Sequence, residues 1–237
     1  MNSLRCEVAI VGTLPCAHDA AAGVVRLRAE AGQHVFAAVP GRVDYIQDGG
    51  RAWRLHCERI VLAEPAVDRR ALLQRLDPEV QVRLDLGSEP ELRLGQLLGC
   101  ELEHVPARGG WNLRVGADLQ TSVPGVEVAG DGVFGTPFPA AAVAQLRELA
   151  AICPCERVPL AAVEQAAREF GVAFRAVKTH TRAGMGLGCQ GMFCRTPIQA
   201  WMQRVLGYDP ASEPPPVARV PLVPVDLATL LAAGDEA

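Results

Sequence analysis

The stretch EVAIVGTLPCAHDAAAGVVRLRAEAGQHVFAAV, residues 7–39, decides the fold class of this chain. An apolar run leads to Gly12, a helix is expected over residues 17–31, and Gly32 is placed to end it. A second apolar run then follows. This alternation predicts a βαβ unit, the usual beginning of an α/β domain with a parallel sheet.

The first turn of this unit is where a dinucleotide-binding domain would carry the pattern G-x-G-x-x-G. Leu14 and Ala17 stand where the second and third glycines belong. The second glycine lets the backbone approach the pyrophosphate, so the side chain of Leu14 would enter the space of the diphosphate. The acidic residue expected about 20 residues further on is also missing, because Val39 and Pro40 end the second strand. The pattern favours a βαβ unit kept for packing over a nucleotide site.

The bulk composition narrows the class of protein. The chain has 237 residues, 49% of them hydrophobic, and a net charge of -4 with a pI near 5.8. This balance argues against nucleic acid or an anionic membrane as a partner. The chain opens with no basic and apolar leader, and no apolar run approaches roughly 18 residues, so we expect a cytoplasmic protein. In a reducing compartment, the eight cysteines are expected to be ligands or buried thiols rather than disulfides.

Hydrophobic periodicity predicts the remaining elements, and a change of composition near Ala151 divides the chain. We expect an α/β domain over residues 1–150, a small helical domain over 151–208 and a proline-rich, extended tail over 209–237. In the first region the predicted elements are a hairpin (43–46 and 52–57, with the turn at 48–50), a strand (60–63), a helix (70–76), a strand (80–86), a helix (92–98), a strand pair around 108–110 and a buried strand before Gly130-Asp131. A helix follows with Val143, Leu146 and Leu149 on one face. Two further helices are expected: one has the apolar face Leu160, Val163, Ala167 and Phe170, and the other has the apolar face Ile198, Trp201, Met202 and Val205.

Two cysteine pairs carry the clearest chemical signal. Cys153 and Cys155 form C-x-C, and Cys189 and Cys194 form C-x₄-C. Four thiolates can hold zinc or a [2Fe–2S] cluster, but zinc sites favour two to four residues between paired cysteines. The glycine-rich loop at residues 184–188 can direct backbone N–H groups toward sulfides, which favours the cluster. Zinc and unliganded thiols remain the alternatives.

Other groups are expected to surround the cluster. Lys178 and Arg182 would add positive charge near it, and Gly184 and Gly186 belong to the loop that would face it. The remaining cysteines share no ligand spacing and are expected to be buried small hydrophobes: Cys6, Cys16, Cys57 and Cys100. The five histidines are scattered, and no nucleophile–base pair is apparent, so no catalytic residue is assigned.

These residues resemble a known family. The strings CPCE (153–156) and TRAGMG…CQG…C (181–194) look like the [2Fe–2S] domain of bacterioferritin-associated ferredoxin. More narrowly, they resemble the version at the C-terminus of the alpha subunits of hydrogen cyanide synthase, opine oxidases and related amino-acid dehydrogenases, apart from one extra residue at Leu187-Gly188. Residues 97–132 resemble the closing FAD segment of these subunits, in which the aspartate matching Asp131 lies near the ribityl chain of the flavin.

The departures from that family concern the AMP-binding half. The family's A-T-G turn reads Ala63-Glu64-Pro65 here, and the second nucleotide domain is missing between residues 69 and 97. Gly12, Gly130 and Asp131 are therefore a remnant of an FAD site, and FAD binding is doubtful. Gly130-Asp131 is open to two interpretations, a plain strand-to-helix turn or a residual flavin contact.

The resemblance implies an electron-transfer subunit. The chain would carry one [2Fe–2S] cluster and relay electrons from a larger flavoprotein partner in a hetero-oligomer, with no catalytic residue of its own. The two alternatives are a free-standing flavoenzyme with an unconventional nucleotide site and a non-redox scaffold with a structural metal.

Overall fold

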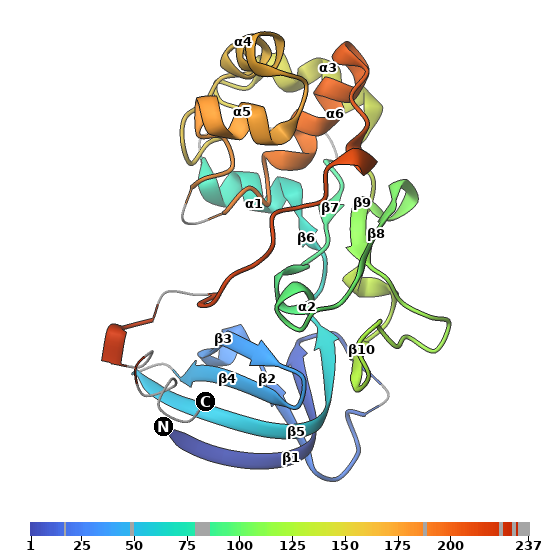
Figure 1. Cartoon of the computed structure of the whole chain (residues 1–237), viewed down its shortest axis with the longest axis vertical. Helices are drawn as coiled ribbons and strands as arrows, with labels where there is room; N and C mark the ends of the chain where they lie inside the picture. The colour runs from blue at the N-terminus through green and yellow to red at the C-terminus, as the bar shows by residue number, and fades with distance from the viewer. Residues whose placement is uncertain are drawn as a thin grey trace.

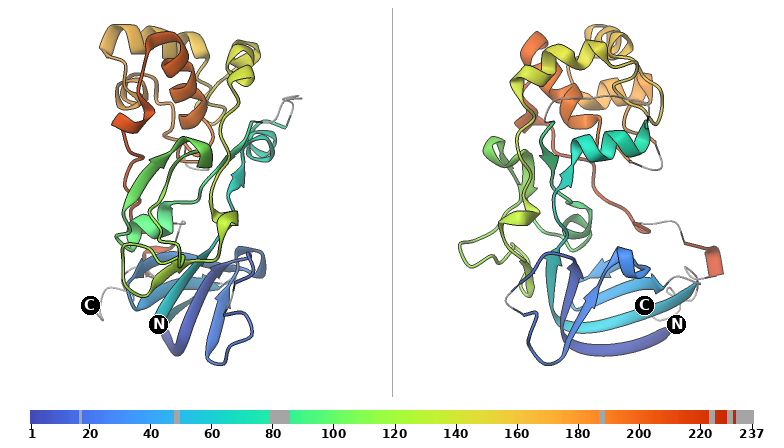
Figure 2. Two further views of the ribbon diagram at one scale, coloured as in Figure 1. Left: turned by 90° about the vertical axis from the view of Figure 1, so that its right-hand side faces the viewer. Right: turned by 180° about the vertical axis from the view of Figure 1, so that it is seen from behind.

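The chain is elongated, with a β-sheet at one end and a group of helices at the other (Figures 1 and 2). Small two-stranded pieces and one short helix lie between these two parts (Figure 1). The computed structural model describes residues 1–16, 18–47, 50–78, 86–186, 189–222, 225–228 and 231. Of the strand predicted over residues 80–86, all but Leu86 falls outside these ranges, as do the turn residues Asp48 and Gly49.

The sheet is mixed and is organised around its two longest strands. Within the described ranges it has six strands: β1 (Asn2–Gly12), β2 (Val24–Leu27), β3 (Gln33–Val39), β4 (Arg42–Gln47), β5 (Arg51–Ala63) and β10 (Val126–Val128). Their order is β2-β1-β5-β4-β3, and β10 pairs with β5. The pairs β1–β2, β1–β5 and β5–β10 are parallel, whereas β3–β4 and β4–β5 are antiparallel. The carboxyl ends of three parallel strands therefore meet at one edge, near Gly12, Ala63 and Ala129.

The helix predicted over residues 17–31 is wrong. The backbone turns at residues 18–23, and the β-branched pair Val24-Val25 begins β2 beside β1. Asp19 accepts a hydrogen bond from the backbone N–H of Cys16 at 2.9 Å, an interaction that competes with helix formation. Arg26 donates to the carbonyls of Gly12 (2.8 Å) and Leu14 (3.0 Å), which fixes the turn after β1. Ala17 itself lies outside the described residues.

The sequence predictions for Gly32 and for the hairpin can also be compared with the structure. Gly32 does end an element, but that element is the 3-10 turn Ala29–Ala31, which Gly32 follows with a left-handed φ of 70°. The hairpin is confirmed as β4 and β5. The separate strand predicted at residues 60–63 is the second half of β5, since β1 pairs with β5 along almost its whole length.

The middle of the molecule follows the predicted order. Helix α1 (Arg69–Leu76) begins at Asp68, whose carboxylate accepts from the backbone N–H of Ala71. The strand pair predicted around residues 108–110 is confirmed as the antiparallel ribbon of β8 and β9. The bounds of the other elements here are β6 (Val67–Asp68), β7 (Ser88–Glu89), α2 (Arg93–Leu97), β8 (Leu102–Val105) and β9 (Gly110–Leu113).

Four helices form the other end of the chain: α3 (Ala140–Gln145), α4 (Leu160–Phe170), α5 (Phe174–Thr181) and α6 (Arg195–Leu206). The predicted faces of α4 and α6 are buried except at their last positions. Phe170 and Val205 are 48% and 44% exposed, so each apolar face reaches solvent at its last residue. Phe170 instead stacks on the ring of His180, with 3.6 Å between the ring centroids. His180 is exposed, as expected for a surface residue.

The apolar cores do not divide at residue 150. One cluster of buried side chains unites α4, α5 and α6 with Leu72 and Leu73 of α1 and with α3. A second cluster lies between the sheet, α2 and the β8–β9 ribbon. Helix α1 and Leu86 therefore pack with the C-terminal helices, although they precede β10 of the sheet in the sequence.

The proline-rich segment after α6 contacts both the helical part of the molecule and the sheet. Glu213 caps the start of α5, accepting from the backbone N–H groups of Phe174 and Arg175 at 2.7 Å each. Further along, Gln96 bonds to the backbone of this segment, and the N–H of Leu222 donates to Phe36 in β3 at 2.9 Å. The segment lies extended along the molecule between the helices and the sheet (Figure 1).

Candidate functional site

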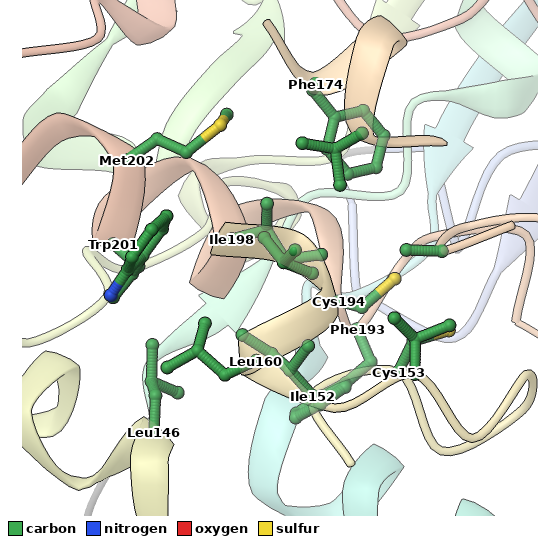
Figure 3. Packing of buried hydrophobic residues seen from close by; sticks show 14 of the residues in the cluster. Leu146, Ile152, Cys153, Leu160, Phe174, Phe193, Cys194, Ile198, Trp201 and Met202 are labelled. Carbon is green, nitrogen blue, oxygen red and sulfur yellow. The ribbon is translucent and has the colours of Figure 1, made fainter. Parts of the chain in front are cut away.

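The four cysteines of the two pairs lie in the helical part of the chain. Cys153 precedes a tight turn before α4, and Cys194 immediately precedes α6. Cys153, Cys189 and Cys194 are buried, whereas Cys155 is exposed. Figure 3 shows Cys153 and Cys194 next to each other within the apolar cluster, close to Ile152 and Phe193. The site is thus sealed from water on one side and open at Cys155.

The four sulfurs interact with one another as two hydrogen-bonded pairs. Cys194 donates to Cys153, and this bond is the main reason that the pKa of Cys153 falls to about 6. The same bond, together with burial, raises the pKa of Cys194 well above its ordinary value. Cys155 is paired with Cys189, and burial and the neighbouring cysteines raise the pKa of Cys155 to about 11. The charges of neighbouring cysteines contribute to the raised pKa of Cys155 and of Cys194, which indicates that the sulfurs of the two motifs lie near one another.

Backbone N–H groups also point at the sulfurs. The N–H of Phe193 donates to the sulfur of Cys189 at 3.1 Å. The backbone N–H groups of Gly184 and Glu156 hydrogen-bond to Cys153 and contribute to its low pKa. Such donors stabilise negative charge on sulfur, which both thiolate ligands and cluster sulfides carry.

Gly186 packs directly against the C-x-C pair. A Cβ atom at residue 186 would lie 2.2 Å from the Cβ of Cys155, a distance that no real contact permits. Gly184 has a left-handed φ of 80°, and its Cβ would be 3.1 Å from the ring of Phe174. The glycine loop therefore approaches the cysteines as closely as a backbone can. Leu187 and Gly188, the site of the extra residue, lie outside the described residues.

The charged groups predicted near the cluster have different environments. Arg182 follows α5 in a left-handed conformation and forms an ion pair with Glu156 at 2.9 Å. Its positive charge is thus partly balanced by the residue that follows Cys155. Lys178 lies half-buried on α5. Within the described ranges, no group of three or more His, Cys, Asp or Glu side chains is arranged so that it could hold a metal ion.

Three features of this region bear on whether it suits an iron–sulfur cluster. Four thiols from two motifs lie near one another, backbone N–H groups hydrogen-bond to two of them, and only a glycine fits against a third. The two hydrogen-bonded pairs, Cys153–Cys194 and Cys155–Cys189, each join one cysteine of C-x-C to one of C-x₄-C. This crossed pairing brings the two halves of the ligand set together.

The sheet edge where an FAD diphosphate would bind is filled by the protein's own atoms. A Cβ at Gly12 would lie 2.2 Å from the carbonyl carbon of Ala63, so the turn after β1 lies directly on the end of β5. The N–H of Leu14 donates to the carbonyl of Ala63 at 2.9 Å. The methyl carbons of Leu14 come within 3.0 and 3.1 Å of the Cβ position of Gly132. Leu14 therefore bridges the turn after β1 and the segment after β10.

The rest of the FAD remnant is equally unsuited to a dinucleotide. The cavity beside Glu64 has a volume of about 20 Å³, room for about one water molecule and far too little for a dinucleotide. Burial and the nearby carboxylates of Glu91 and Glu30 raise the pKa of Glu64. Gly130 has no atom within 4 Å of its Cβ position, and the side chain of Asp131 is 91% exposed, 4.0 Å from Arg108. The residues present do not fit FAD.

The isolated cysteines behave largely as small apolar residues. Cys57 and Cys100 are buried, and burial raises the pKa of both, that of Cys57 to about 12. Cys6 and Cys16 are half-buried, which differs from the expectation of full burial.

A buried ion network joins β7, in the middle of the molecule, to helices α1 and α6, and no sequence pattern indicated it. Glu89 of β7 accepts from Arg69 at 2.8 Å and from Thr196 at 2.6 Å, and it pairs with Arg195 at the start of α6. Arg69 also donates to the carbonyls of Leu86 and Thr136. No local pattern links residues so far apart in the sequence, so only the folded arrangement shows them as a unit.

Comparisons with known proteins place the fold. No protein-family model matches the chain, and a search of curated proteins finds no match. The chain is similar to the crystal structure of L-proline dehydrogenase from P. horikoshii, with 14% identity and a TM-score of 0.66. The similarity covers 97% of this chain and 80% of that chain. At this identity it shows the fold, and it confirms the predicted Rossmann-like α/β class. None of the described helices is both long and apolar enough to cross a bilayer.

Proposed function

We propose that this chain is the [2Fe–2S] electron-transfer subunit of a multi-subunit flavin-dependent amine or amino-acid dehydrogenase. The observation that carries the proposal is that the fold brings the C-x-C and C-x₄-C motifs together: Cys153 lies beside Cys194, and the glycine loop packs against Cys155 (Figure 3). These four cysteines would hold the cluster, which supplies one-electron transfer when bound. The fold that the chain shares with an L-proline dehydrogenase supports an oxidoreductase role.

The residues around the cysteines would set the properties of the cluster. The apolar wall formed by Ile152 and Phe193 excludes water from one side, and the backbone N–H groups on Cys153 and Cys189 stabilise reduced, more negative states. Cys155 is the exposed corner. We expect electrons to enter or leave there, because the distance to a docked partner is shortest at that point.

The flavin is assigned to a partner subunit. This assignment follows from the poor fit of the FAD remnant, in which Leu14 and Ala63 occupy the edge of the sheet. Substrate oxidation would then also occur in the partner. In this proposal residues 1–150 form the shortened nucleotide-binding-like part, 151–208 the bacterioferritin-associated-ferredoxin-like part and 209–237 the tail.

The absorption spectrum of the anaerobically purified chain tests the assignment of both cofactors. We expect the visible bands of an iron–sulfur cluster without a flavin shoulder. Recovery of near-stoichiometric FAD with the lone chain would support a free-standing flavoenzyme instead. A featureless visible region with bound zinc would support a structural scaffold.

Co-expression tests the partner. The chain should co-elute on size exclusion with a larger flavoprotein encoded nearby, through an interface of roughly 1,600 Å² or more. The described part of the tail packs on its own chain rather than projecting away. The interface is therefore expected elsewhere, next to the exposed Cys155. A monodisperse monomer that oxidises an amine unaided would contradict the subunit role.

A further inference from the structure

A cavity of about 220 Å³ lies between the first half of α6 and the β8–β9 ribbon. Its apolar side is formed by Trp111, Phe138 and Pro106. Its polar side includes Arg195 and Gln199, both of them more than 90% buried. At ~30 Å³ per water, this volume holds about seven water molecules, or one small organic molecule. The cavity is separate from the four cysteines and from the FAD remnant.

The charges beneath this cavity do not balance. Arg69 and Arg195 both pair with Glu89, so two guanidinium groups face one carboxylate. Burial would raise the pKa of Glu89, but the two arginines and Thr196 outweigh burial and keep it below its ordinary value, so Glu89 is ionised. The network therefore has one positive charge in excess.

The unsatisfied hydrogen-bonding capacity of this network lies on Arg195. The hydrogen bonds of Arg69 go to Glu89 and to two backbone carbonyls. In contrast, Nη1 of Arg195 is buried and has no hydrogen-bond partner among the described residues. A buried guanidinium N–H without an acceptor is costly, so this nitrogen favours the arrival of an anion or a polar molecule.

We propose that this cavity binds a small monocarboxylate with an apolar or aromatic body, its carboxylate on Arg195 and its body against Trp111. A carboxylate accepts from guanidinium groups with favourable geometry, and a single negative charge matches the single excess positive charge. The indole ring of Trp111 is held in place because its N–H donates to the carbonyl of Pro210 at 3.1 Å. The aromatic face is thus prepared for an apolar ligand before binding.

Benzoate is a suitable probe, and benzamide is its uncharged control. Titration calorimetry on the full chain should detect benzoate binding and at least tenfold weaker binding of benzamide. Benzoate should also change the fluorescence of the chain, and W111F should remove that change while calorimetric binding persists. Failure of the unmodified chain to bind benzoate, or equal binding of benzamide, would overturn the proposal.

Variants locate the carboxylate. R195Q should weaken benzoate binding at least tenfold, whereas R204Q, which changes an exposed arginine near the other end of α6, should leave it unchanged. E89Q should strengthen benzoate binding, because the carboxylate that competes with the ligand for Arg195 is then replaced by a neutral amide. Unchanged affinity in R195Q would refute the assignment. If inorganic phosphate binds and benzoate does not, the ligand class proposed here is wrong.

Discussion

Removal of the Glu89 side chain should weaken the contact of β7 with helices α1 and α6. The E89A variant leaves Arg69 and Arg195 buried with no carboxylate between them. Breaking a buried ion pair in this way costs about 3–5 kcal/mol, because charge stays buried without compensation. The hydrogen bond from Thr196 to Glu89 is lost as well, which places the expected cost in the upper part of that range.

This free energy corresponds to a large shift in melting temperature. For a chain of this size, 1 kcal/mol lowers Tm by about 2–4 °C, so E89A should lower Tm by about 6–20 °C. Thermal unfolding followed by circular dichroism on the full chain measures it. The matched control is E101A, which breaks the exposed pair of Glu101 and Arg114, worth about 0–1 kcal/mol. A Tm loss in E89A no larger than in E101A would refute the reasoning about the buried network.

Three further changes test separate features. E213A removes the carboxylate that caps α5 and should destabilise the chain by about 1–2 kcal/mol in urea unfolding, with no effect expected on iron content; an unchanged stability would show that the cap is not needed. G186A forces a methyl group into Cys155 and should strongly reduce iron content while the sheet stays folded; normal iron loading would contradict the close packing of the loop. E64Q should stabilise the chain at about pH 7, because burial raises the pKa of Glu64 in the folded state and ionisation therefore favours unfolding as pH rises. This gain should vanish below about pH 4, where folded and unfolded states are both protonated, and an equal gain at both pH values would argue against titration of Glu64.

Much of the fold was predictable because it depends on local patterns. Alternating apolar residues gave β4 and β5, and the glycine pair at 109–110 gave the β8–β9 ribbon. The apolar spacing of α4 and α6 identified their buried faces apart from the final residues. At the ends of surface helices, a residue in phase with the core can still be exposed, as Phe170 and Val205 are.

The prediction failed where side chains compete with the backbone over longer distances. Residues 17–31 have helical periodicity, but Asp19 bonds to the backbone of Cys16, and Arg26 holds the carbonyls of Gly12 and Leu14. The contacts of Arg26, which lies in β2, form only when β2 lies beside β1. The same limit applies to Glu89, whose partners at residues 69 and 195 are far away in the sequence.

For the candidate site, sequence spacing identified four cysteines, and the structure adds how they are paired. The crossed pairs Cys153–Cys194 and Cys155–Cys189 could not be derived from spacing, since C-x-C and C-x₄-C are compatible with other arrangements. The motif also gave no sign that Arg182 would be balanced by Glu156. Charge pairing across a loop depends on the folded turn rather than on the motif.

The central claim is that these four cysteines hold a [2Fe–2S] cluster, and iron and sulfide analysis with electron paramagnetic resonance tests it most directly. The anaerobically purified chain should contain about two iron and two sulfide per chain and give the signal of a reduced cluster after dithionite treatment. Serine at residue 153, 155, 189 or 194 should abolish or greatly reduce both, while C57S and C100S should retain them. Iron content that survives the loss of Cys155, or a chain that binds no iron under these conditions, would contradict the account.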